Sequence, residues 1–307
     1  MAVSLFGNHT SEVYKQMYKD YNKTEEDLDQ YVDIMRQWAE SQPHFPEVPS
    51  KKVLKFVILY NKFSIEKAKQ KLDMYYTIRS LMPEIYDHHP LSPDMILHGK
   101  ITYCVPLPKL TSDCKRILFA QLNPNYGPDV FDHEKLLIHV HHVLELLIQE
   151  DDTYNFHLIF DCGSIRAAHL PKFSPMVVRK ASIIIEKVYS NRMASIYLVN
   201  FHSFMEAVFN TILIPALNKK IRDRVKISAN TDILFDVFGK DVLPKDVGGN
   251  ELSLEELNNL LLKKFEENKE SYERVSKLRV NESLRPDKLV NDDLLGYYGN
   301  FRKINVD

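Results

Sequence analysis

Residues 156–161 read FHLIFD, a short and almost wholly apolar run that ends in an acid. β-branched and aromatic residues favour strands, and a nearly continuous apolar run is typical of a strand covered on both faces. A second run of this kind, SIYLVNF, occupies residues 195–201. The two runs predict buried strands of one sheet.

Three more stretches have strand character: TYCVPL, RILFAQL and RVKISA, at residues 102–107, 116–122 and 224–229. Helical patterns at 133–150, 174–189 and 203–218 lie between the strands. Strands that alternate with helices predict an α/β sheet. The Pro- and Gly-containing stretch LPKDVGG (243–249) ends this pattern, so we place an α/β domain at residues 96–250.

The flanking segments are expected to be helical. Residues 9–82 contain helical patterns, and Thr24 with Asp27 resembles a capping box that opens a helix to about Glu40. We therefore predict a helical domain at residues 1–95. Ser253 and Glu256 form a second capping box, which predicts one long polar helix to about residue 280 within a C-terminal part, residues 251–307.

Composition limits the function classes. The chain has 307 residues, a net charge near −2 and three cysteines without a CxxC motif. No basic stripe with interleaved aromatic residues is present, so nucleic acid is not an expected partner. The cysteine usage favours a reducing compartment, and no apolar run approaches the ~18 residues of a membrane span. We expect a cytoplasmic monomer.

Signatures of catalysis are absent. The sequence has no GxGxxG after a strand, no GxxxxGK[ST] and no GxSxG. Cys162 in FDCGSIR has no evident base and is interpreted as a small buried residue. These absences predict a protein that is not an enzyme and uses no cofactor.

The helix at 133–150 carries several histidines. His139 and His142 are i, i+3 neighbours and could share a metal ion, but no carboxylate stands at ligand spacing, so no metal site is predicted. A helix with mixed faces explains them equally. In a third interpretation, His142 and Glu145 are polar groups in an apolar cavity that orient the head group of a ligand.

Residues 203–226, SFMEAVFNTILIPALNKKIRDRVK, join an apolar helix directly to a basic stretch. An ordinary core helix followed by a solvated one is the simplest explanation. The alternative is a lid over an apolar pocket beside a cationic patch, since each basic residue near anionic lipid contributes about 1 kcal/mol of attraction. We adopt the second interpretation and call residues 203–217 the gate segment.

Several stretches together resemble the CRAL-TRIO family over about residues 51–250, in particular its branch of α-tocopherol transfer and retinaldehyde-binding proteins. They are NKFSIEKAKQKLDMYYTIRSLMPEIY (61–86), FHLIFD with its final Asp161, SIYLVN, AVFNTILIPALNKKIRDRVK (207–226) and DVLPKDVGG (241–249). The resemblance implies a non-enzymatic carrier in which a mixed sheet, helices and a gate enclose an apolar lipid pocket. The gate segment has one more residue than the family pattern, near Pro215.

The resemblance also implies site residues. Those carried over to the ligand pocket are Phe156, Leu158, Phe160, Ile184, Ile185, Tyr189, Ile196, Phe204, Val208, Phe209 and Ile212. Each of these apolar residues would be buried in any α/β domain, so core packing remains the alternative.

Basic positions of the family's phosphoinositide-binding members match Arg192, Lys219, Lys220 and Arg224. A further basic position is replaced here by Ile58 or Leu59. The expected function is transfer of a tocopherol-, retinoid- or carotenoid-like isoprenoid, with transient docking on anionic or phosphoinositide-containing membranes. The alternatives are a phospholipid or phosphoinositide exchange protein and a signalling adaptor with a vestigial pocket.

Overall fold

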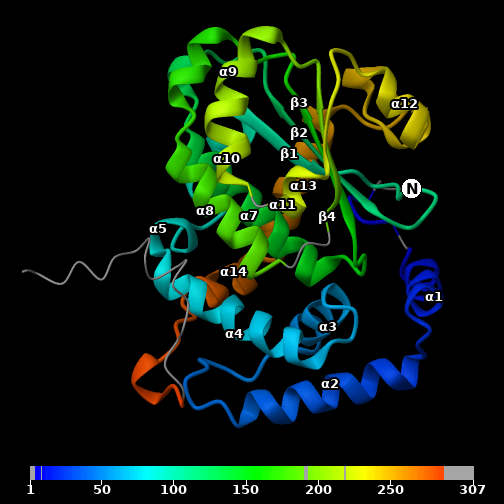
Figure 1. The fold of residues 1–307 in the computed structure, drawn as a ribbon, viewed down its shortest axis with the longest axis vertical. Coiled ribbons are helices and arrows are strands. Elements are labelled where there is room, and N and C mark those ends of the chain that lie inside the picture. The colour runs from blue at the N-terminus through cyan, green and yellow to red at the C-terminus, as the bar shows by residue number, and fades with distance from the viewer. Residues whose placement is uncertain (1–3, 8, 190–192, 218, 287–307) are drawn as a thin grey trace, which may run out of the picture.

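The computed structural model describes residues 4–7, 9–189, 193–217 and 219–286. Its N-terminal part is helical, and an α/β part with a mixed sheet follows (Figure 1). This arrangement confirms the predicted fold class. Within the described residues, none of the helices is both long and apolar enough to cross a membrane.

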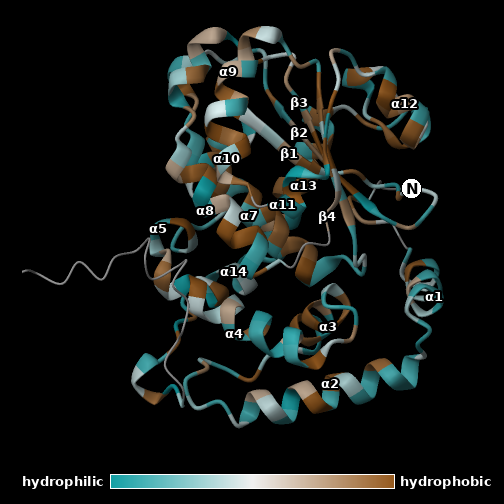
Figure 2. Cartoon of the chain, in the orientation of Figure 1, coloured by the Kyte–Doolittle hydropathy of each residue, from teal (hydrophilic) through white to brown (hydrophobic). Residues whose placement is uncertain are grey.

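Five helices build the N-terminal part: α1 (Thr10–Tyr21), α2 (Glu25–Glu40), α3 (Lys51–Tyr60), α4 (Ile65–Leu81) and α5 (Pro83–Tyr86). α2 begins as predicted, because Thr24 and Asp27 form the reciprocal hydrogen bonds of a capping box. α2, α3 and α4 pack on one another. Figure 2 shows hydrophobic and hydrophilic bands alternating along α2, as on an amphipathic helix with one buried face.

The α/β part contains a five-stranded sheet in chain order: β1 (Thr102–Pro106), β2 (Arg116–Leu122), β3 (Phe156–Asp161), β4 (Met193–Val199) and β5 (Val225–Ile227). β1 and β2 are antiparallel, and the other neighbours are parallel. The helices that connect or cover the strands are α6 (Pro93–Ile101), α7 (His133–Glu150), α8 (Pro175–Lys187), α11 (Lys219–Arg222) and α12 (Asp232–Phe238).

The two faces of the sheet meet different helices. His157 and Tyr197 share one face, and both rings contact Phe238 of α12. Side chains alternate along a strand, so Leu158 and Leu198 point to the opposite face. Figure 1 shows α8 and the gate segment on that side and α12 on the other.

The gate segment is not the uniform helix that we expected. It passes through a 3-10 turn η3 (Ser203–Met205), α9 (Glu206–Val208), a π-helical turn η4 (Phe209–Leu213) and α10 (Ile214–Ala216). The N–H of Ile214 donates to the carbonyl of Phe209, five residues back. Pro215 has no N–H to donate to Thr211, and a π turn takes up an extra residue at this point. The extra residue that the family resemblance places near Pro215 falls in the same region.

The prediction of a single C-terminal helix is also wrong. It is divided at Asn268 into α13 (Leu254–Glu267) and α14 (Lys269–Val275). The Asn268 side chain donates to Glu150 of α7 and to the backbone carbonyl of Lys264, contacts that hold the chain at the break. Ser253 and Glu256 form the expected capping box at the start of α13. α13 packs on β1 and α6 with Leu257 and Leu261 wholly buried, so it is not a polar helix.

Candidate functional site

The face of the sheet that looks toward the gate segment contains apolar side chains that solvent reaches. Leu158 and Phe160 of β3 and Leu198 of β4 are only partly buried, although both strands lie inside the sheet. On the opposite face, Ile159 and Val199 are completely buried. The helices above the gate-facing side of the sheet therefore leave part of its apolar surface uncovered, at Leu158, Phe160 and Leu198.

The gate segment and α8 lie on the same side of the sheet as this apolar surface (Figure 1). α8 packs against η4 and α10. Val208 and Ile212 of the gate and Ile185 of α8 are partly buried, and Phe204 is 41% exposed. Phe209 is buried and its ring stands edge-on to Phe201. Partly exposed apolar side chains thus occur on the sheet, on α8 and on the gate.

The remaining pocket candidates are more deeply buried. Phe156 of β3, Ile184 of α8 and Ile196 of β4 belong to the main hydrophobic core. Tyr189 follows α8, and its hydroxyl lies 2.9 Å from Nδ1 of His141, also buried. Core packing accounts for these four side chains without a ligand.

Glu145 already has partners in the structure. Its carboxylate accepts a hydrogen bond of 2.6 Å from the Tyr75 hydroxyl and pairs with Arg79 at 2.9 Å, and all three side chains are buried. Tyr75 and Arg79 come from α4, so this cluster joins the N-terminal helices to α7. A ligand would have to compete with both partners for the carboxylate.

His142 lies in a mixed environment. Its Nε2 is 2.9 Å from the carbonyl of His88, and its Nδ1 is buried with no hydrogen-bond partner. The ring is edge-on to Phe265 and Tyr272. Burial lowers the pKa of His142 to about 4, so the ring is neutral at pH 7. Among the residues that the structure describes, no three metal-binding side chains come together.

A groove of about 450 Å³ lies where the N-terminal helices meet the α/β part. Its cationic lining residues are Lys62, Lys67, Lys71, Lys220 and Arg224, and we call this site the basic groove. The other described lining residues are Tyr60, Asn61, Gln70, Asn155, Met193 and Ala194, with no carboxylate among them.

Two of the predicted phosphoinositide residues, Lys220 and Arg224, line the basic groove. Lys219 does not line it among the described contacts: its side chain is 81% exposed and pairs with Asp223 at 2.7 Å. Arg192 lies outside the described residues. Ile58 and Leu59, at the expected position of a further basic residue, are buried in the core.

Three lysines of the basic groove were not predicted as site residues. Lys67 and Lys71 are i, i+4 neighbours on α4, and Lys62 follows α3. Their spacing is a weak signal, because charged residues four apart are usual on any exposed helix face. Only the docking of α4 beside α8 brings them to Lys220 and Arg224.

Lys71 differs from the other lysines of the groove in its surroundings. It is partly buried, whereas Lys62, Lys67 and Lys220 are exposed. Its ammonium donates a hydrogen bond to the backbone carbonyl of Glu186 at the end of α8. Burial lowers the pKa of Lys71 to about 8; the charge of Glu186 opposes this shift, and those of Lys187 and Lys220 increase it.

This geometry has a counterpart in known families. Residues 100–249 match the CRAL/TRIO domain, and residues 24–95 match a Pinta-like UBA domain. The chain contains a CRAL/TRIO domain. The match supports membership of the CRAL-TRIO family and, in general terms, a role in lipid binding or transfer.

One solved structure similar to this CRAL/TRIO protein is the crystal structure of Sfh5. The match covers 81% of this chain and 96% of that chain, with a TM-score of 0.51 and 10% sequence identity. At this identity the likeness supports the fold alone. The partly exposed apolar face and the basic groove remain the features of this chain from which a function is argued.

Proposed function

We propose that this CRAL/TRIO protein is a non-enzymatic carrier of one small lipophilic molecule, of the tocopherol, retinoid or carotenoid class. The observation that carries the proposal is the partial exposure of Leu158, Phe160 and Leu198 on the inner strands, below the gate segment. Apolar residues at such positions are normally fully buried, and an apolar ligand between the sheet and the gate segment would complete their burial.

Burial of the ligand would supply the affinity. About 25 cal/mol is gained for each Å² of apolar surface removed from water, so enclosing ~400 Å² contributes on the order of 10 kcal/mol before the costs of association. A ligand held this strongly leaves slowly unless its enclosure opens. Release therefore requires a movable wall.

The gate segment is suited to be that wall. It changes helix type within 14 residues, from 3-10 to α to π and back to α, and it contains a proline. π turns often occur at functional sites. We propose that the segment opens about this π turn when the protein meets a membrane.

The basic groove would direct opening to anionic membranes. It begins at α11, directly after the gate segment, and continues onto α3 and α4 of the N-terminal part. Phosphate groups of a lipid head group, including a phosphoinositide, would bring negative charge to the five cations that line the groove. Binding there would favour whichever gate conformation binds the head group better.

The experiment that tests the proposal is organic extraction of the purified full chain, followed by mass spectrometry and an absorbance spectrum. We expect one isoprenoid or polyene per chain, or its uptake from a panel of lipids. A stoichiometric phospholipid would identify an exchange protein, a function that the basic groove also supports because it can hold a phosphate. Recovery of neither, without uptake, would overturn both and favour an adaptor.

A further inference from the structure

The Lys71 amine is held in place at the wall of the basic groove. α4 carries it to the groove, and its hydrogen bond to the carbonyl of Glu186 fixes it against α8. The groove, about 450 Å³ in volume, leaves room beside this amine for a small molecule. Lys62, Lys67, Lys220 and Arg224 surround the same space and favour a molecule with negative charge.

We propose that Lys71 is a modification site, at which the side-chain amine condenses with an aldehyde that also carries a phosphate or similar anionic group. The surrounding cations hold the anionic group, and the amine attacks the carbonyl carbon. Anion binding and nucleophilic attack both come from residues of one groove. Neither depends on the apolar face below the gate segment.

The reaction needs no oxidant or further reactant. The nitrogen lone pair forms a C–N bond, the carbonyl π electrons move to the oxygen, and that oxygen takes a proton. The carbinolamine then loses its hydroxyl as water and the nitrogen loses a proton, which leaves a C=N bond. The balance is amine plus aldehyde giving imine plus water.

Only the unprotonated amine is a nucleophile, and the surroundings of Lys71 favour this form. Desolvation and neighbouring cations are the usual means by which proteins activate a lysine. With a pKa of about 8, roughly a fifth of Lys71 is unprotonated at pH 7.4, compared with about one thousandth of an ordinary lysine. Lys71 should therefore react faster with an aldehyde than the exposed lysines beside it.

The modification would also regulate the groove. An imine at Lys71 occupies the space and brings an anionic group to the other cations, so it would block docking on anionic lipid. This regulatory consequence rests on the proposed function, whereas the covalent reaction does not.

The test uses the full chain with pyridoxal 5′-phosphate, reduction by borohydride and peptide mapping by mass spectrometry. We expect Lys71 to be labelled at least tenfold faster than Lys62 and Lys67, the exposed lysines of the same groove. Labelling of Lys71 should slow at least fivefold with excess pyrophosphate, and with pyridoxal, which lacks the phosphate. Its rate should level off above about pH 8, while those of Lys62 and Lys67 keep rising.

The variant Lys71→Arg keeps the charge and removes the nucleophile. It should eliminate fast labelling in the groove without new fast labelling at Lys62 or Lys67. Labelling of the wild-type chain in proportion to lysine exposure, or an unlabelled Lys71 beside labelled neighbours, would overturn the proposal. Both results are independent of the lipid extraction, so failure of this inference and failure of the carrier proposal are distinguishable.

Discussion

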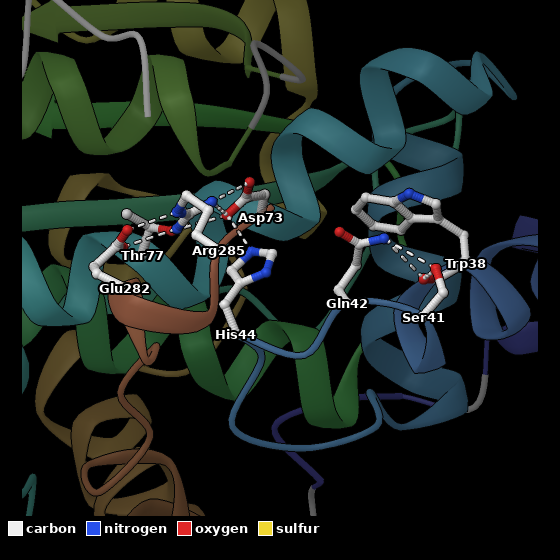
Figure 3. Close-up of polar contacts among 8 residues, drawn as sticks. All are labelled: Trp38, Ser41, Gln42, His44, Asp73, Thr77, Glu282 and Arg285. Carbon is white, nitrogen blue, oxygen red and sulfur yellow. Dashed lines mark hydrogen bonds and ion pairs between the residues drawn. The ribbon is translucent and has the colours of Figure 1, made fainter. Parts of the chain in front are cut away.

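Arg285 and Asp73 lie 212 residues apart in the chain and form an ion pair in which both carboxylate oxygens of Asp73 accept hydrogen bonds from Nη1 of Arg285, at 2.8 and 2.6 Å (Figure 3). The same guanidinium bonds Glu282 through Nε and Nη2 and donates to the Thr77 hydroxyl. Asp73 and Thr77 belong to α4, while Arg285 and Glu282 lie beyond α14. The end of the described chain is thereby attached to the N-terminal helices.

We expect Arg285→Ala to lower the free energy of unfolding by about 2–3 kcal/mol. The Arg285 side chain is 5% exposed, and its removal leaves Asp73 without its strongest partner. Urea unfolding followed by circular dichroism measures the loss. The control is Lys269→Ala, which breaks an exposed i, i+4 pair with Glu273 and should change stability by about 0.5 kcal/mol or less. Equal losses in both variants would contradict a special role of the Arg285–Asp73 pair.

Stability should fall in mild acid because of the histidines buried around α7. Burial lowers the pKa of His139 to about 3 and those of His98 and His142 to about 4, whereas in the unfolded chain each is near 6.5. Between these values the unfolded state binds more protons. Their contribution is therefore fully present above about pH 6.5 and declines as the pH falls toward 4.

Urea titrations at pH 7.5 and 5.5 measure this decline, which is up to about 1.4 kcal/mol per histidine for each pH unit below 6.5. His139→Gln should make the pH dependence shallower by about one such contribution, even if the variant is less stable at pH 7.5. An unchanged pH dependence in His139→Gln would show that this ring does not carry the effect.

Neighbouring residues of β4 offer a direct test of the space below the gate. Leu198→Trp places a larger side chain on the partly exposed face and should reduce bound ligand at least fivefold while leaving the melting temperature within a few degrees. Val199→Trp, on the closed opposite face, should lower the free energy of unfolding by about 1–3 kcal/mol or more through overpacking. Comparable destabilisation by both, with ligand content of Leu198→Trp unchanged, would favour a filled core on both faces.

Membrane docking is tested with two double variants of equal charge change. Lys67→Glu/Lys220→Glu reverses one exposed groove lysine on α4 and one on α11, and we expect at least tenfold weaker binding to vesicles that contain phosphoinositide, since each charge near the surface contributes about 1 kcal/mol. Lys69→Glu/Lys219→Glu changes the same two helices outside the described lining of the groove and should weaken binding less than threefold. If both lose affinity equally, net charge and not the groove directs docking.

Elements with strong local signals were predictable. The capping boxes at Thr24 and Ser253 form as expected, because they involve backbone and side chains only three residues apart. The strands FHLIFD and SIYLVNF pair in the structure, with Leu158 opposite Ile196. The break at Asn268 was not predictable, since its contact with Glu150 joins residues 118 positions apart.

The candidate site divides in the same way. The sequence of residues 203–226 alone shows which residues are apolar and that a basic stretch follows the gate segment. Which of the apolar residues are only partly buried depends on how the helices close over the sheet. For this reason Leu198 was missed, and Glu145, expected near a ligand, is paired with Arg79.

By itself the sequence determined the α/β class and the helical N-terminal part, because periodicity and capping act over a few residues. It also determined that a basic stretch directly follows the apolar gate segment. Only the tertiary structure decided that Lys62, Lys67 and Lys71 meet Lys220 and Arg224 in one groove, and that one face of the sheet stays partly open. Both outcomes depend on the packing of helices distant in sequence, where burial and charge sum over surfaces that no single stretch contains.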